Sequence, residues 1–147
     1  MARPSQTFPA SLDALPLVLA CVDECREGVD ADTLMRARIA VEELFMNFVC
    51  HGGAQGNSLQ AWLEVRCDSG RLNVSFEDSA APFDPFADLV HASEGLDQPL
   101  ELRSEGGVGR LLIKQLADSA CYSRSDGRNC IELVFSPRTQ MEQSTAL

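Results

Sequence analysis

Apolar residues near the N-terminus follow a helical period. The opening residues, with Pro4 and Pro9, are interpreted as a short tail or an edge strand. Ser11 then offers an N-cap to a run of apolar residues spaced three or four positions apart. This pattern predicts a first helix that ends near Gly28, where the chain can turn.

The strongest helical pattern lies over residues 31–51. Asp30 or Asp32 can cap its start, and two glycines after His51 mark its end. Between these points apolar side chains recur every three or four positions, which puts them on one face of a helix. That face consists of Leu34, Ala37, Val41, Leu44, Phe45 and Phe48.

The apolar period then shortens to two, which is typical of a half-buried strand. Residues 59–67 alternate in this way, a turn at residues 68–70 follows, and residues 72–76 continue the alternation. This predicts an antiparallel hairpin. A second hairpin is predicted from residues 120–123 and 130–135, which flank an Asp-Gly turn.

A long segment with prolines and little periodicity, residues 79–105, separates the two hairpins. Loops of this length inside compact domains are usually functional. The segment ends at residues 106–109, a glycine-rich run that opens another helix. Three helices and at least four strands in this order predict an α+β fold. We expect a two-layer α/β sandwich, with a mixed, mainly antiparallel sheet and the helices on one face.

The length of 147 residues predicts a single domain, with its core at about residues 10–136 and a polar tail at 137–147. The formal net charge of −10 disfavours nucleic acid and anionic membranes as partners. It is compatible with a nucleotide, because backbone N–H groups and a metal ion can hold phosphates. The apolar stretch at residues 15–22 does not read as a signal peptide, so we expect a cytoplasmic protein.

Polar residues with possible chemistry follow one stripe of the helix predicted at 31–51. Glu43, Asn47 and His51 are spaced four residues apart, so they lie beside the apolar face. The amide oxygen of Asn47 suits Mg²⁺, and the Glu43 carboxylate can polarise a hydroxyl or a water. His51 either helps to form the site or only ends the helix. Taken alone, Glu43 and Asn47 are also compatible with an ordinary exposed pair.

Two further candidates lie later in the chain. Asp78, at the end of a predicted strand, can accept a hydrogen bond from an exocyclic amine while the apolar residues at 80–83 sandwich a base. An Asp at a strand end is also a common turn former. The glycines of residues 106–109 expose N–H groups at a helix start, which is an anion site. Their spacing matches neither a Walker loop nor a dinucleotide fingerprint.

The order of these pieces is more specific than any one of them. The chain resembles the GHKL (Bergerat-fold) ATPases, and most closely the anti-sigma-factor serine kinases, over about residues 10–136. Residues 41–52 resemble the N box of that family, residues 77–85 its G1 box, and residues 106–113 its G2 box.

The resemblance implies ATP and Mg²⁺ as ligands, with roles for individual residues. Asn47 is implied to bind Mg²⁺, Glu43 to be the general base, and Asp78 to bind the adenine amine. The phosphates are implied to lie against the glycine run, under a lid formed by the segment that precedes it. The remaining nucleotide-binding positions are implied to be His51, Ala80, Phe83, Gly106, Gly107, Val108 and Gly109.

The function implied by the resemblance is an anti-sigma factor with ATP-dependent serine kinase activity. Its implied partners are a sigma factor, an anti-anti-sigma antagonist that receives the phosphate, and a second copy of the chain in a homodimer. Ala80 stands where the G1 box usually has glycine, and its methyl group can crowd the base. The alternatives are therefore a non-catalytic binding module of the same fold, and an unrelated α+β domain whose motifs coincide by chance.

Overall fold

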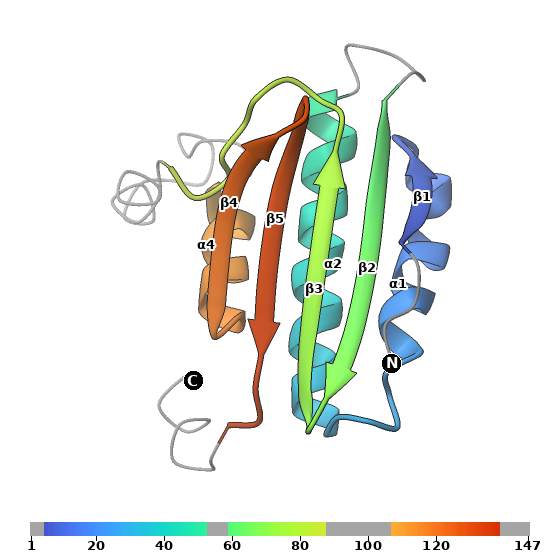
Figure 1. Ribbon diagram of the computed structural model, residues 1–147, viewed down its shortest axis with the longest axis vertical. Helices are drawn as coiled ribbons and strands as arrows, with labels where there is room; N and C mark the ends of the chain where they lie inside the picture. Colours follow the sequence, from blue (N-terminus) through green and yellow to red (C-terminus); the bar gives the residue numbers. More distant parts are fainter. Residues whose placement is uncertain (1–4, 53–58, 88–106, 139–147) are drawn as a thin grey trace.

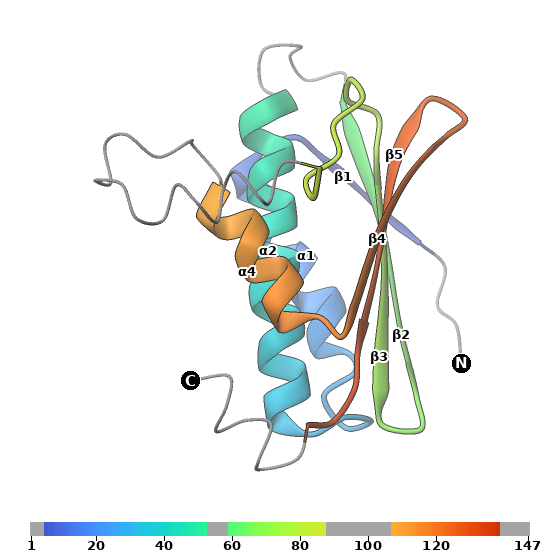
Figure 2. The ribbon, with the colours of Figure 1, turned by 90° about the vertical axis from the view of Figure 1, so that its left-hand side faces the viewer.

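The computed structural model describes residues 5–52, 59–87 and 107–138, and in these ranges one sheet carries helices on a single face (Figures 1 and 2). The predicted α+β two-layer architecture is confirmed. Gly106, most of the segment 79–105 and the end of the tail lie outside the described residues. The elements in chain order are β1 (Gln6–Pro9), a 3₁₀ turn (Leu12–Ala14), α1 (Leu15–Asp23), α2 (Ala31–Gly52), β2 (Gln60–Asp68), β3 (Arg71–Asp78), α4 (Gly107–Leu116), β4 (Ser119–Ser125) and β5 (Arg128–Phe135).

The sheet has the strand order β1-β2-β3-β5-β4, and its four pairings are all antiparallel. The N-terminal segment forms the edge strand β1, in which Phe8 lies opposite Ala61 of β2. Both predicted hairpins are present, and the two central residues of each turn have positive φ. This is the geometry of a type I′ turn, which matches the twist of the flanking strands. The turn residues are Ser69 and Gly70 in the first hairpin and Asp126 and Gly127 in the second.

The core lies between the sheet and the helices (Figure 2). In β3 alternate residues from Leu72 to Asp78 are buried, so the last inward position of this strand carries a carboxylate. Val41 and Phe45 on α2 are completely buried under the sheet, and Figure 1 shows α2 running behind β3 and β5. α1 and α4 pack on either side of α2. The helix that carries three candidate residues is therefore the central one.

The ends of the helices follow from local hydrogen bonds. Of the two aspartates that could cap α2, Asp30 does so, since its Oδ1 accepts from the N–H of Thr33 at 2.7 Å. The first helix ends earlier than predicted, at Asp23 rather than near Gly28. Cys25 and Gly28 each donate a backbone bond three residues back, which tightens the chain into turns. None of the described helices is both long and apolar enough to cross a membrane.

A buried arginine joins the start of α2 to the end of α4 and to the residue that follows β5. Arg36 on α2 is 3% exposed, and its Nη1 donates to the carbonyl of Leu116 at 2.9 Å, at the end of α4. The same nitrogen lies 3.4 Å from Asp118, and Nη2 donates to the carbonyl of Ser136 after β5. Its Nε pairs with Asp32 at 2.8 Å. These partners satisfy the N–H groups of the guanidinium and so offset part of the cost of its burial.

We expect Arg36→Met to lower the free energy of unfolding by about 3 kcal/mol, because it removes a buried charge from its ion pairs with Asp32 and Asp118 and takes a donor from the carbonyls of Leu116 and Ser136. Urea unfolding monitored by circular dichroism measures this. Arg38→Met is the matched control on the same helix, because Arg38 is 38% exposed and pairs only with Asp23 in the described chain. Its loss should cost about 0–1 kcal/mol. Equal losses for both variants would contradict the role given to Arg36.

Candidate functional site

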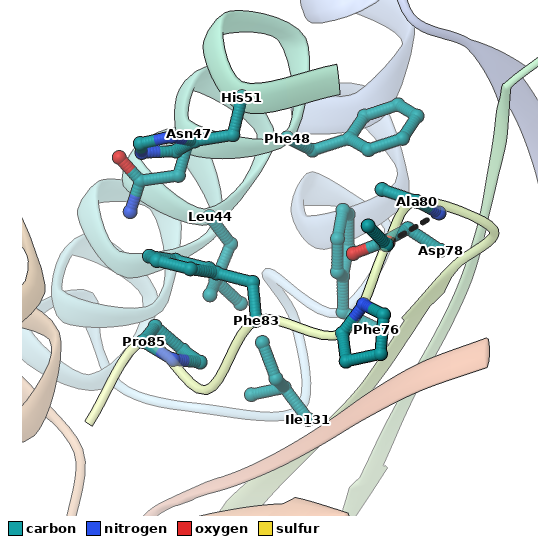
Figure 3. Close-up of a pocket in the computed structure, with 12 residues that line it drawn as sticks. Leu44, Asn47, Phe48, His51, Phe76, Asp78, Ala80, Phe83, Pro85 and Ile131 are labelled. Atoms are coloured by element: carbon teal, nitrogen blue, oxygen red, sulfur yellow. Dashed lines mark hydrogen bonds between the residues drawn. The ribbon is translucent and has the colours of Figure 1, made fainter. Parts of the chain in front are cut away.

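A cavity of about 220 Å³ opens at one end of the two layers, between the C-terminal half of α2, the end of β3 and the loop that follows it (Figure 3). Its wall is mainly apolar, with few polar groups, which is typical of small-molecule sites. The residues that line it are Leu44, Asn47, Phe48, His51, Phe76, Asp78, Ala80, Ala81, Pro82, Phe83, Pro85 and Ile131. Asn47, His51, Asp78, Ala80 and Phe83, which the sequence placed in a site, are brought together here.

Asp78 is the buried carboxylate of the cavity and is 7% exposed. Its Oδ1 accepts a hydrogen bond from the N–H of Ala80 at 3.0 Å, which Figure 3 shows as a dashed line. The same oxygen accepts from Nδ2 of Asn129 at 2.9 Å. Burial raises the pKa of Asp78 above its ordinary value, and the two hydrogen bonds oppose that rise. Both bonds found in the described chain go to Oδ1, so Oδ2 is left for a donor in the cavity.

Ala80 takes an ordinary backbone conformation. Among the described residues other than glycine, only Ser69 and Asp126 have positive φ, so the position of Ala80 does not require glycine for its dihedral angles. Its methyl group lines the cavity and packs against the core. The methyl group of Ala80 therefore occupies part of the cavity without straining the chain.

Asn47 carries an orphaned polar atom. Its Nδ2 is buried and has no hydrogen-bond partner in the described part of the structure, which is rare in folded proteins. Because Asn47 lines the cavity, a ligand atom is the natural partner for this group. An amide rotated by half a turn presents its oxygen instead, so the same side chain fits either a phosphate oxygen or a cation.

Phe83 closes the side of the cavity that faces α4. Its ring stacks on His51 with centroids 4.7 Å apart, and the Arg110 guanidinium of α4 lies 5.6 Å from its centroid. Arg110 also donates to the carbonyl of Pro85 at 3.5 Å. His51 thus lies in the last turn of α2 and contacts the loop that bounds the cavity.

Glu43 lies outside the cavity lining, one turn before Asn47, and faces α4. A Cβ built on Gly109 would lie 3.1 Å from Cδ of Glu43 and closer still to Oε2. The absence of a side chain at Gly109 therefore lets the carboxylate approach the first turn of α4. Gly107 and Val108 form the start of this helix, where backbone N–H groups have no helical partner. The predicted base and the predicted phosphate loop are neighbours in the fold.

Asn129 and Tyr122, which were not among the predicted site residues, support Asp78 from the second hairpin. Asn129 is 2% exposed, and its Oδ1 accepts from the Tyr122 hydroxyl at 2.6 Å. One signal was present in the sequence. Asn129 occupies an inward position of the alternation that continues with Ile131 and Leu133, where a polar residue is unusual.

The chain matches a known protein family. A family model described as a histidine kinase-like ATPase domain matches residues 8–135, which is well over half of the chain. Among curated proteins, none matches this sequence. The matched range runs from β1 to the end of β5 and so includes every element that builds the cavity.

We expect Gly109→Ala and Glu43→Ala to be coupled in stability. Alanine favours a helix over glycine by about 1 kcal/mol, but with Glu43 present the new methyl group must displace the carboxylate. Gly109→Ala should therefore be about 1 kcal/mol less favourable in the wild-type background than in the Glu43→Ala background. Denaturant unfolding of the four proteins measures the coupling. Additive effects would show that the two residues do not touch.

Asp78→Asn should stabilise the protein at neutral pH. The folded state binds the Asp78 proton more tightly than the unfolded state, because burial raises its pKa above 3.8. The wild type therefore loses stability relative to the variant as the pH rises from 3.8 through the raised pKa. Below 3.8 the carboxyl is protonated in both the folded and the unfolded state, and this difference in stability disappears. Thermal unfolding of both proteins across this range measures it. A variant that is less stable than the wild type at neutral pH would contradict the burial cost.

Proposed function

We propose, from the premise that the chain belongs to the histidine kinase-like ATPase domain family, that it binds Mg-ATP and transfers the terminal phosphoryl group to a protein serine. Asp78 carries this proposal, because it is a buried carboxylate with one oxygen facing an apolar cavity. An exocyclic amine is a suitable donor for that oxygen, and the apolar walls suit a flat base. Adenine combines these two properties.

The phosphate end of the nucleotide is assigned to α2 and the start of α4. The orphaned amide of Asn47 lies on the wall of the cavity and fits a phosphate oxygen or the ligand set of Mg²⁺. A bound Mg²⁺ supplies neutralisation of phosphate charge. The first turn of α4, beginning at Gly107, offers backbone N–H groups to the phosphates. This arrangement needs no positive protein surface, in agreement with the acidic composition.

Glu43 is proposed as the general base. In the transfer step the serine oxygen forms a bond to the terminal phosphorus, the bond from that phosphorus to the bridging oxygen breaks, and ADP leaves. The serine proton passes to the Glu43 carboxylate. The support for this role is the position of Glu43 one turn from Asn47 and against Gly109, where the terminal phosphate would lie.

The proposed protein partners come from the resemblance of the three sequence boxes to anti-sigma-factor serine kinases. In this proposal the phosphate acceptor is a small anti-anti-sigma antagonist, and the chain sequesters a sigma factor when the antagonist is absent. A homodimer is part of the same proposal. One observation favours the non-catalytic alternative, since the methyl group of Ala80 narrows the cavity where the family usually has glycine.

We expect Glu43→Gln to bind Mg-ATP with nearly wild-type affinity but to transfer phosphate at least about 100-fold more slowly, because the amide cannot take the serine proton. Asn47→Ala should lose both binding and transfer. Titration calorimetry measures the binding. Incorporation of labelled phosphate into purified anti-anti-sigma proteins of the same organism measures the transfer.

Glu42→Gln is the matched control, because Glu42 neighbours Glu43 on α2 but is exposed. It should behave as the wild type in both assays. Equal transfer by the Glu43→Gln variant would remove Glu43 as the base. Absence of ATP binding by the wild type, together with a nucleotide-independent complex with a partner, would favour the non-catalytic module.

A further inference from the structure

Asn129 occupies the first inward position of β5 and lies directly opposite Asp78 of β3 in the sheet register. It is 2% exposed and is not part of the cavity wall. A nucleotide in the cavity therefore meets Asp78 and not Asn129. Any effect of Asn129 on a ligand has to pass through the groups that its amide holds.

The hydrogen-bond capacity of the Asn129 amide is fully used. Its Nδ2 donates to Oδ1 of Asp78 at 2.9 Å and to the carbonyl of Ala81 at 3.0 Å. Its Oδ1 accepts from the N–H of Phe83 at 3.1 Å and from the Tyr122 hydroxyl at 2.6 Å. A backbone N–H can only donate and a carbonyl can only accept, so these partners fix which side of the amide is oxygen and which is nitrogen.

This amide links the two parts of the cavity that face a base. On one side it donates to a single oxygen of Asp78, Oδ1. This bond fixes the plane of the carboxylate, and Oδ2 then points away from Asn129. On the other side it holds the loop at Ala81 and Phe83, and Phe83 forms a wall of the cavity. One side chain, Asn129, thus fixes the position of the Asp78 carboxylate relative to Phe83.

We propose that Asn129 is the positioning residue for base selectivity, which orients Asp78 so that Oδ2 accepts the exocyclic amine of adenine. This inference rests on the proposed binding of ATP and adds to it a residue that does not touch the nucleotide. The two N–H donors on Oδ1, from Asn129 and from Ala80, also favour the charged form of the carboxylate. A charged carboxylate only accepts hydrogen bonds, so it selects a ligand that donates at this point.

A merely structural role predicts a different result. If Asn129 only satisfies buried polar groups, its replacement weakens the fold and with it the binding of every nucleotide by the same factor. If it positions Asp78, its replacement removes the advantage of nucleotides that carry the amine. The ratio of two affinities separates these cases, because a general loss of stability cancels in the ratio.

The test compares ATP with purine riboside triphosphate, which has hydrogen in place of the exocyclic amine. Asn129→Asp has the same shape and keeps an oxygen for Phe83 and Tyr122, but it puts an oxygen where the donor to Asp78 was. We expect the wild type to prefer ATP by roughly ten- to a hundredfold, the range for a hydrogen bond to a charged group. In Asn129→Asp the preference should fall close to unity. Titration calorimetry of both nucleotides measures it.

Tyr122→Phe gives a second, milder variant in case Asn129→Asp does not fold. It removes one bond that orients the amide, and the preference should fall to an intermediate value. Ser123→Ala, at an exposed residue of the same strand, is the control and should keep the wild-type preference.

Equal weakening of both nucleotides in Asn129→Asp would overturn the inference while leaving ATP binding intact. If only Tyr122→Phe folds, an unchanged preference in that variant would overturn the inference. A wild type that binds neither nucleotide would overturn the proposed function and this inference with it.

Discussion

The burial of α2 against the middle of the sheet is the constraint on which the other features depend. From Ala37 to Phe48 the buried face of this helix is apolar, and Val41 and Phe45 have no exposure at all. The helical repeat places residues four apart next to one another on the helix surface. Residues at this spacing can therefore form a line along the boundary between the apolar face and the polar face. Glu43, Asn47 and His51 follow this line, and the packing that forms the core therefore also aligns them with the cavity and with α4.

Elements with a regular local pattern could be predicted from the sequence. The first hairpin was predicted from strict alternation around a turn at residues 68–70, and the second from two strand-like runs that flank an Asp-Gly turn. The central helix was predicted because its apolar residues recur at helical spacing and a capping aspartate, Asp30, stands directly before them. The stripe of candidate residues on α2 needed only the helical repeat. Each of these inferences depends on residues that are close in the sequence.

What could not be predicted depends on contacts between distant segments. Asn129 and Asp78 are 51 residues apart, and they meet because β3 pairs with β5 and not with β4, the strand that follows β3 in the chain. The approach of Glu43 to Gly109 depends on the distance between α2 and α4. The early end of α1 has a local cause, the turns after Asp23 in which an N–H bonds to the carbonyl three residues earlier. Such turns keep nearly the same apolar spacing as a helix, so the sequence pattern does not mark the point where the helix ends.

α4 is held at the end that lies away from the cavity. Arg36 and Arg138 both donate to the carbonyl of Leu116 at its last residue, while its first turn faces Glu43. The helix has ten residues and is therefore about 15 Å long. A rod of that length, fixed at one end, moves its other end by about 1 Å for a tilt of about 4°. The position of the first turn of α4 relative to a phosphate is therefore set in part by Arg36 and Arg138, which contact the opposite end of the helix.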